Sequence, residues 1–202
     1  MRVVSLVPSV TETLLAWDVP VLACTRFCEQ PHVLHVGGTK DPDIAAIVAL
    51  RPDVVVVDRE ENRREDFEAL TSAGVAVHVT HVTSVHDVAS MLAGLAEAVG
   101  ARLPEISPVP SAEVPWTTAF VPIWKRPWMT MNARTYGSSI LDLLGVRNLF
   151  ATHADTYPIV DVGEVAAEHP SLVLLPSEPY PFAERQLPRQ VLRASTPRRA
   201  PT

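Results

Sequence analysis

The sequence predicts an α/β protein built from two units with parallel sheets. Short β-branched runs alternate with amphipathic helical segments over the first hundred residues. The connections between them are short, which indicates parallel strands joined by right-handed crossovers. A proline-rich stretch then precedes a second, shorter strand–helix pattern. We therefore expect an amino-terminal lobe at 1–100, a linker at 101–116, a carboxyl-terminal lobe at 117–184 and a disordered basic tail at 185–202.

Four strands are predicted in the first lobe from apolar, β-branched runs. They lie at 3–6, 19–25, 54–57 and 75–80. The run at 54–57 consists of four valines, a pattern typical of a strand buried on both faces of a parallel sheet.

Capping chemistry predicts where the helices of this lobe begin. Ser9 with Glu12 forms a capping box. Asp41 followed by Pro42 is typical of an N-cap and a proline at the first helical position. The remaining helices are expected at 62–71, before Gly74, and at 84–99, before Gly100.

The second lobe begins with a strand at 117–123, followed by a loop rich in aromatic residues. Trp124, Trp128 and Tyr136 are expected on this loop. Ligands of open α/β sheets bind outside the carboxyl ends of the strands, and flat aromatic faces suit a bulky planar ligand. Local packing against the sheet is the alternative. The rest of the lobe is predicted as helices at 139–144 and 162–169 and a strand at 172–175.

Composition narrows the class of protein. The chain has 202 residues, of which 47% are hydrophobic and 20% charged, as in an ordinary globular protein. Its net charge of −6 argues against nucleic acid as the main partner. No signal-peptide pattern opens the sequence and no apolar run could span a bilayer, so we expect a cytoplasmic monomer. A misassigned start codon would instead allow a periplasmic or cell-surface location.

Metal and catalytic motifs are weak. Cys24 and Cys28 form a lone C-x3-C, for which reduced thiols without a metal are expected. His78 and His81 need not face the same way because they are three residues apart across a strand end, and His86 follows later. Neither a G-x-S-x-G elbow nor an H-E-x-x-H motif occurs. The sequence therefore predicts no enzyme, no metal site and no required cofactor.

Five segments together resemble a known family. They are RVVSLVPSVTETLLA, VGGTKDPDIAAIVALRPDVVVV, REENRREDFEALTSAGVAVHVT, VPIWKRPWMT and LLPSEPYPF. They are similar to class III periplasmic binding proteins, also called helical-backbone metal receptors, and most of all to the cobalamin-binding branch of ABC-importer substrate-binding proteins. The resemblance covers most of 2–182. It implies two Rossmann-like lobes with parallel sheets around a ligand cleft, joined by a long helix.

The sequence departs from the family in the interlobe connection and at its carboxyl-terminal end. The prolines between 102 and 115 shorten the interdomain connection. After residue 182 the family continues with a strand and a terminal helix, which this sequence does not supply. The carboxyl-terminal lobe is therefore expected to be truncated.

The resemblance also implies where a ligand binds. The implied contacts are Phe27, Lys40, Asp41, Trp124, Trp128, Tyr136, Glu178 and Tyr180. Glu61 and Arg126 are added as charged residues at the expected cleft edge, although Glu61 equally suits a solvated helix start. Thr39 and Asp58 stand where the cobalamin binder has tryptophans, which leaves the ligand open.

We predict a binding protein for a bulky metal-containing ligand, most of all cobalamin or another corrinoid. Haem or a ferric siderophore is an alternative ligand. A tetrapyrrole chelatase-like enzyme and an inactive fragment are alternative functions. The family implies an ABC permease as partner, but Ala45 and Gly163 replace its two docking glutamates, with Glu164 one residue away.

Overall fold

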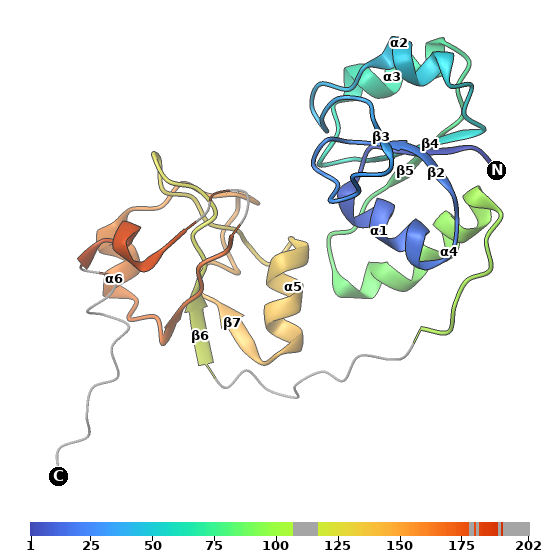
Figure 1. The fold of residues 1–202 in the computed structure, drawn as a ribbon. Helices are drawn as coiled ribbons and strands as arrows, with labels where there is room; N and C mark the ends of the chain where they lie inside the picture. The colour runs from blue at the N-terminus through green and yellow to red at the C-terminus, as the bar shows by residue number, and fades with distance from the viewer. Residues whose placement is uncertain (107–116, 178–179, 181, 190, 192–202) are drawn as a thin grey trace. The chain divides into compact units, whose positions relative to one another are not determined.

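The chain forms two compact units. The computed structural model describes residues 1–106, 117–177, 180, 182–189 and 191. One unit comprises Met1–Val82 with Asp87–Ser107, and the other comprises Thr83–His86 with Pro108–Thr202 (Figure 1). Of the predicted linker, 101–106 lies within the described residues and 107–116 lies outside them.

The first unit is built on a five-stranded parallel sheet. Its order is β3-β2-β1-β4-β5. The strands are β1 (Val3–Ser5), β2 (Val21–Cys24), β3 (Leu34–His35), β4 (Val54–Asp58) and β5 (Val77–Thr80). The chain adds strands on one side of β1 and then on the other, so the order reverses between β1 and β4. In such sheets ligands bind outside the carboxyl ends of the strands at this reversal.

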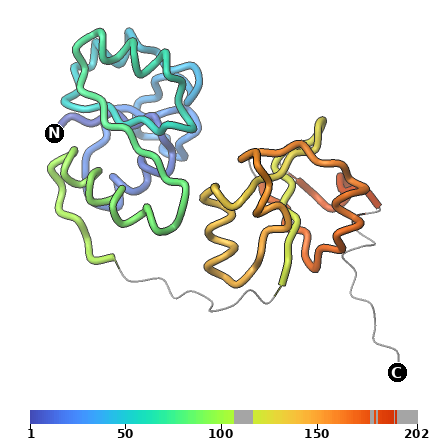
Figure 2. Tube along the Cα trace, turned by 180° about the vertical axis from the view of Figure 1, so that it is seen from behind, coloured from blue at the N-terminus to red at the C-terminus, as the bar shows by residue number. Residues whose placement is uncertain are grey.

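Helices cover both faces of the first sheet. They are α1 (Pro8–Ala16) and α4 (Val88–Val99) on one face, and α2 (Ile44–Ala49) and α3 (Arg64–Ser72) on the other (Figures 1 and 2). Alternate strand residues face opposite ways, so Val56 packs with the first pair of helices and Val55 with the second. Both valines are fully buried, as the four-valine run predicts.

The second unit has a smaller parallel sheet of order β7-β6-β8. Its strands are β6 (Thr117–Phe120), β7 (Val146–Asn148) and β8 (Leu172–Val173), and its helices are α5 (Tyr136–Leu143) and α6 (Val162–Ala167). Ala119 packs with Leu141 of α5, whereas Phe120 packs with Val165 of α6. The helices thus flank the sheet on its two faces (Figure 1).

Two predicted helix starts are wrong. Val7 is the N-cap of α1, without a side-chain hydrogen bond, and Pro8 occupies the first turn. Ser9 is therefore inside the helix, because proline's fixed φ lets the helix begin one residue earlier. In α2 the cap is Asp43, whose carboxylate accepts a 2.9 Å hydrogen bond from the Ala46 amide, and Asp41 lies outside the helix.

Tyr136 was predicted on a loop, and this is also wrong. It is the first residue of α5, because the Thr135 hydroxyl caps that helix by accepting a hydrogen bond from the Ser138 amide. The start predicted at residue 139 overlooked this cap. The strands β3 and β7 were not predicted, and each is only two or three residues long.

The basic tail is ordered at its beginning, contrary to the prediction for 185–202. Glu184–Gln186 forms a 3-10 helix, and Leu187 and Val191 are 7% and 1% exposed. Val191 packs with Phe120 and Val165 in the core of the second unit. Two apolar side chains four residues apart therefore anchor this segment, while 192–202 lies outside the described residues.

Both cysteines are free and buried. The Cys28 thiol lies 3.4 Å from the hydroxyls of Thr25 and Thr11. Burial, and then the neighbouring Cys28, raises the pKa of Cys24 to about 12.

Burial also lowers the pKa of His78 below its ordinary value. In the described residues, no three His, Cys, Asp or Glu side chains lie close enough to hold a metal ion.

We expect Cys24 to be inert in the folded protein. A thiol reacts as the thiolate, and a buried thiol with a pKa near 12 supplies almost none at neutral pH. A Cys28→Ser variant isolates Cys24, and mass spectrometry after iodoacetamide treatment measures its alkylation. Alkylation should require denaturant. Rapid modification of the native variant would contradict the assigned burial.

Candidate ligand-binding surfaces

The carboxyl edge of the first sheet is held together by one buried amide. Asn62, which is 8% exposed, donates from Nδ2 to the carbonyls of Leu6 at 3.2 Å and Thr39 at 2.9 Å. Its Oδ1 accepts a 2.7 Å hydrogen bond from the Asp58 amide. Asn62 therefore joins the loops that follow β1, precede α2 and follow β4, at the reversal of strand order.

Phe27 and Asp41, both predicted ligand contacts, are brought together by Arg26. The Arg26 guanidinium forms two 3.0 Å hydrogen bonds with the Asp41 carboxylate and lies 4.9 Å from the centre of the Phe27 ring. These hydrogen bonds lower the pKa of Asp41. Phe27 remains 56% exposed. Arg26 was not predicted as part of this surface, since no sequence pattern pairs it with a residue fifteen positions away.

The two other predicted contacts in this unit lie on neighbouring loops. Lys40 Nζ donates a 2.8 Å hydrogen bond to the carbonyl of Glu60, which links the loop before α2 to the loop after β4. The Glu61 amide donates to Asp58 Oδ1 at 3.3 Å. Both residues thus lie beside the loops that Asn62 joins.

In the second unit, a short hairpin after β6 carries an aromatic cluster. The hairpin is closed by hydrogen bonds from the Ile123 amide to the Met129 carbonyl and from the Met129 amide to the Trp124 carbonyl. Trp124 meets Tyr180 edge to face, with ring centres 5.7 Å apart. The ring centres of Tyr180 and Phe182 are 4.6 Å apart. Trp124 is 43% exposed, so an aromatic face remains open to a ligand.

Trp128 has a different environment from Trp124. Its ring stacks on Phe182 at 5.8 Å, and the Lys125 ammonium lies 5.4 Å from its centre. It also packs against the core around Phe120. The Lys125 ammonium donates a hydrogen bond to the Gln186 carbonyl, and Gln186 Nε2 donates one to the Tyr180 hydroxyl. These hydrogen bonds connect the hairpin, the loop after β8 and the 3-10 helix. These contacts favour local packing as the role of Trp128.

The remaining predicted contacts of this unit are dispersed. Arg126 lies at the exposed tip of the hairpin with a positive φ of 73°. Tyr136 starts α5 and is 43% exposed. Glu178 lies outside the described residues.

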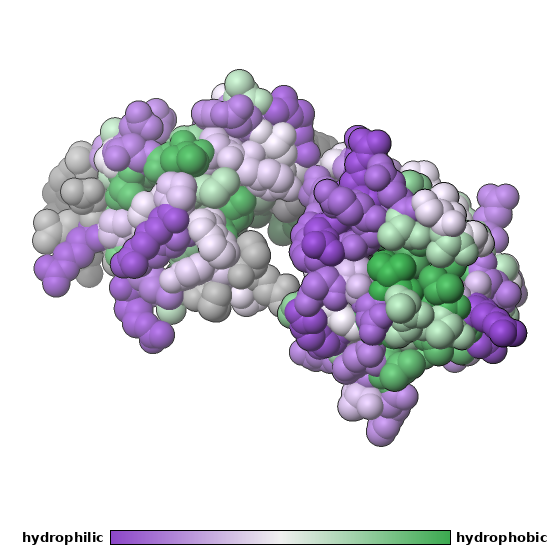
Figure 3. Space-filling model, turned by 90° about the horizontal axis from the view of Figure 1, so that it is seen from above, coloured by the Kyte–Doolittle hydropathy of each residue, from purple (hydrophilic) through white to green (hydrophobic). Residues whose placement is uncertain are grey.

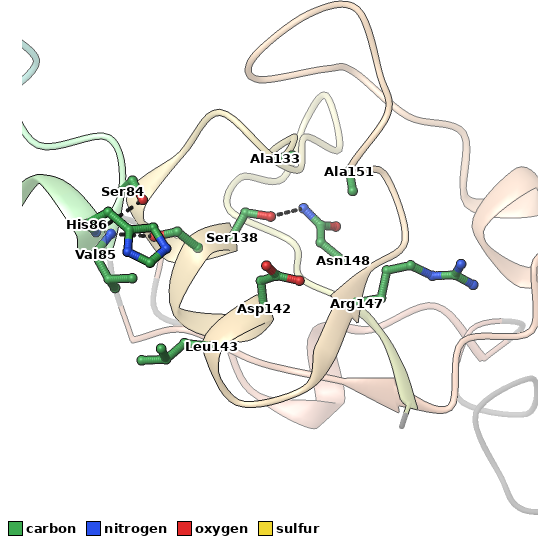
Figure 4. A pocket seen from close by; sticks show the side chains of 11 residues that line it. Ser84, Val85, His86, Ala133, Ser138, Asp142, Leu143, Arg147, Asn148 and Ala151 are labelled. Carbon is green, nitrogen blue, oxygen red and sulfur yellow. Dashed lines mark hydrogen bonds between the residues drawn. The ribbon is translucent and has the colours of Figure 1, made fainter. Parts of the chain in front are cut away.

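A polar pocket of about 290 Å³ lies within the second unit (Figure 4). Ser138 and Asn148 face each other across its floor, with a 3.0 Å hydrogen bond between Asn148 Nδ2 and Ser138 Oγ. Asp142 and Arg147 are exposed lining residues. The Val85 amide donates to Ser139 Oγ at 2.9 Å, which attaches 83–86 to α5. This pocket was not predicted from the sequence.

An apolar groove of about 460 Å³ lies beside β6 and β8. Its lining residues are Val121, Ile123, Met131, Gly137, Leu141, Leu174, Leu175 and Pro176. Apolar side chains also gather in patches on the surface of each unit, among polar ones (Figure 3). In the part of the chain that the structure describes, no helix is long and apolar enough to cross a membrane.

One known protein family matches the first part of the chain. Residues 3–102 match the family model described as "Periplasmic binding protein". The class III periplasmic-binding-protein resemblance and the predicted fold of two units with parallel sheets are confirmed.

Relatives cover both units. The vitamin B12-binding protein of Salmonella paratyphi A is 24% identical over 190 residues, which span 86% of this chain and 71% of that protein. Among solved structures, the periplasmic vitamin B12-binding protein of Vibrio cholerae matches with a TM-score of 0.70 at 18% identity, over 86% of this chain and 75% of that one. A periplasmic haem-binding protein from Roseiflexus matches with a TM-score of 0.68 at 16% identity, over 86% and 75%. At these identities the structural matches establish the fold alone.

We expect Asn62→Ala to destabilise the first unit. It would leave the carbonyls of Leu6 and Thr39 and the amide of Asp58 without their side-chain partner. Each buried polar group left unpaired costs about 1–3 kcal/mol, so a loss of about 3 kcal/mol is expected. Urea unfolding measures it.

Thr71→Ala is the matched control. Thr71 is exposed, and its hydroxyl donates only to the Phe67 carbonyl within α3. It should change the free energy of unfolding by less than about 1 kcal/mol. Equal effects of the two substitutions would contradict the role of Asn62.

Proposed function

We propose that this chain is a substrate-binding protein for a bulky planar ligand, foremost a corrinoid such as cobalamin. The observation that carries the proposal is the Trp124–Tyr180 pair, a half-exposed aromatic surface at the carboxyl edge of the second sheet. Binding is reversible contact without covalent chemistry. The prediction that the ligand lies in a cleft between the lobes stays a prediction.

Charged side chains flank this aromatic surface. Lys125 and Arg126 follow Trp124 directly in the hairpin. An aromatic face with cations at its edge suits a ligand that combines a flat apolar ring with an acidic group. A corrinoid has a phosphate in its nucleotide arm, and the curated relatives are named as vitamin B12-binding proteins.

Haem is the second candidate ligand. It is flatter than a corrin and carries two carboxylates, which the same cations would pair with. Structural neighbours named as haem-binding proteins support this candidate, and so does the absence of tryptophan at Thr39 and Asp58. A ferric siderophore remains the third ligand predicted from the sequence.

Reversible binding also fits the relatives, which are named as binding proteins rather than as enzymes. The family works with ABC permeases, so a permease is the partner class that we propose. Ala45 lies in α2 and Gly163 in α6, and neither brings a carboxylate to these helices. Weak permease docking therefore stays a prediction, which binding of the chain to permease-containing membranes would test.

Titration of the purified chain with cobalamin and with haemin tests the proposal. We expect saturable binding of one of them by isothermal titration calorimetry, at micromolar or lower dissociation constant. Trp124→Ala should weaken that binding at least tenfold, or about 1.4 kcal/mol. Trp124→Phe, which keeps a flat ring, should lose less. A folded protein that binds neither ligand would overturn the proposal.

Trp128→Ala is the matched control because it removes the same side chain from the same hairpin. Since Trp128 stacks on Phe182 and packs on the core, we expect its loss to lower stability by about 2 kcal/mol. Below the melting temperature, ligand affinity should fall less than in Trp124→Ala. The reverse order would show that Trp128 is the contact.

A further inference from the structure

Strand β5 is an open edge of the first sheet. It is the last strand in the order β3-β2-β1-β4-β5, so it pairs with β4 alone. The carbonyls of Ala76 and Thr80 accept hydrogen bonds from the β4 side, at 2.9 and 3.0 Å. A strand residue directs its amide and carbonyl to one side, and successive residues alternate, so Val77 and Val79 direct theirs away from β4. Within the described part of the chain, these outward groups have no hydrogen-bond partner.

A groove of about 460 Å³ lies between this edge and α3. Its apolar lining residues are Val57, Phe67 and Val79. Val57 and Val79 are direct partners in the register of β4 and β5, so both side chains project toward α3. Val57 is buried, whereas Val79 is 44% exposed because no further strand covers it. The edge therefore combines unpaired backbone groups with an apolar groove.

The charged residues around the groove leave one cation over. Arg63 forms two 2.9 Å hydrogen bonds with the Asp66 carboxylate, and Arg64 lies 2.7 Å from the Glu68 carboxylate. Arg59 is an exposed lining residue. Among the described residues, its guanidinium has no ion pair.

The carboxylate next to Arg59 in sequence has other partners. Asp58 accepts hydrogen bonds from the Thr80 hydroxyl at 2.9 Å and from the Glu60 amide at 2.8 Å. Arg59 follows Val57 by two residues and lines the same groove. A carboxylate brought to this end of the groove would thus meet a guanidinium that can form a charge-assisted hydrogen bond.

An extended peptide has the chemistry that this edge requires. A strand added beside β5 would pair with the backbone groups of Val77 and Val79, and its alternate side chains would face the groove. An apolar side chain there would cover Val79. A carboxylate two positions away in the peptide would reach Arg59.

A second copy of the chain fits the edge less well. Residues 74–80 read GVAVHVT and contain no carboxylate, so pairing of two β5 strands would leave Arg59 without an acidic partner. A stable protein interface also needs about 800 Å² on each side, more than a four-residue edge strand supplies.

We propose that β5 and the groove beside α3 bind an extended acidic segment of another polypeptide by strand addition. The outward groups of Val77 and Val79 supply main-chain hydrogen bonds, while Val79 and Arg59 select the side chains. This site lies in the first unit and is independent of the small ligand proposed above.

The probe is the peptide acetyl-TETVTET-amide, whose valine and glutamates share one face of an extended strand. Its symmetric order suits a parallel or an antiparallel added strand. Isothermal titration calorimetry with the full chain should show saturable binding, with a dissociation constant of about 100 µM or lower. The matched peptide acetyl-TQTVTQT-amide should bind about tenfold more weakly, because it cannot form an ion pair with Arg59.

Variants of the chain test the two halves of the site. Arg59→Gln should weaken binding of the acidic peptide about tenfold and abolish its advantage over the glutamine peptide. Arg51→Gln is the matched control, since Arg51 is an exposed arginine at the other end of the first sheet and should change affinity less than about twofold. Val79→Pro removes an outward amide and leaves the pairing with β4 intact, so binding should be lost. Val79→Thr keeps that amide and should retain binding.

The outcomes decide the proposal. A folded wild-type chain that does not bind the acidic peptide would overturn it, and so would wild-type affinity in a folded Val79→Pro variant. Equal affinity for the two peptides would overturn the acidic partner. A dimer in light scattering that Val79→Pro abolishes would show that a second copy covers β5, and would overturn it too. If Val79→Pro fails to fold by circular dichroism, Arg59→Gln and the glutamine peptide still decide.

Discussion

The common direction of the strands is the constraint on which the rest of this structure depends. Every pairing in both sheets is parallel, so all carboxyl ends of a sheet meet at one edge. The loops at that edge lack ladder partners and need other hydrogen bonds. Asn62 supplies them in the first unit. In the second unit the hairpin after β6 forms its own backbone hydrogen bonds, between Ile123 and Met129 and between Met129 and Trp124.

The small size of the second sheet explains how its aromatic residues are used. With β8 only two residues long, strand pairing fixes little of the chain that follows it. Phe182 holds that chain by stacking on Trp128, and Tyr180 holds it by an edge-to-face contact with Trp124. One tryptophan consequently completes the core while the other stays at the surface. A cluster that looks uniform in sequence therefore has two physical roles.

Segments with a periodic pattern of buried side chains could be predicted from the sequence. Which of several neighbouring residues takes a given local role, such as a helix cap, could not. The four valines of β4 and the long helix before Gly100 are set by hydrophobic pattern, and both are present. Asp41 was predicted as the cap of α2 because Pro42 follows it, whereas Asp41 pairs with Arg26 and Asp43 caps the helix. The bridge between Met129 and Ile159 was not predicted because Pro158 argues against a strand, although the Pro158 carbonyl accepts a hydrogen bond from the Thr130 amide.

The two aromatic surfaces are not energetically equivalent for a planar ligand. The Arg26 guanidinium, held by Asp41, already lies over the Phe27 ring. A ligand ring must displace that cation or use the opposite face of Phe27, and displacement would break a bidentate ion pair. Trp124 makes an edge-to-face contact with Tyr180 and stays 43% exposed, so a ligand can reach it without breaking an ion pair. Contact with a flat ring should therefore cost less at Trp124 than at Phe27.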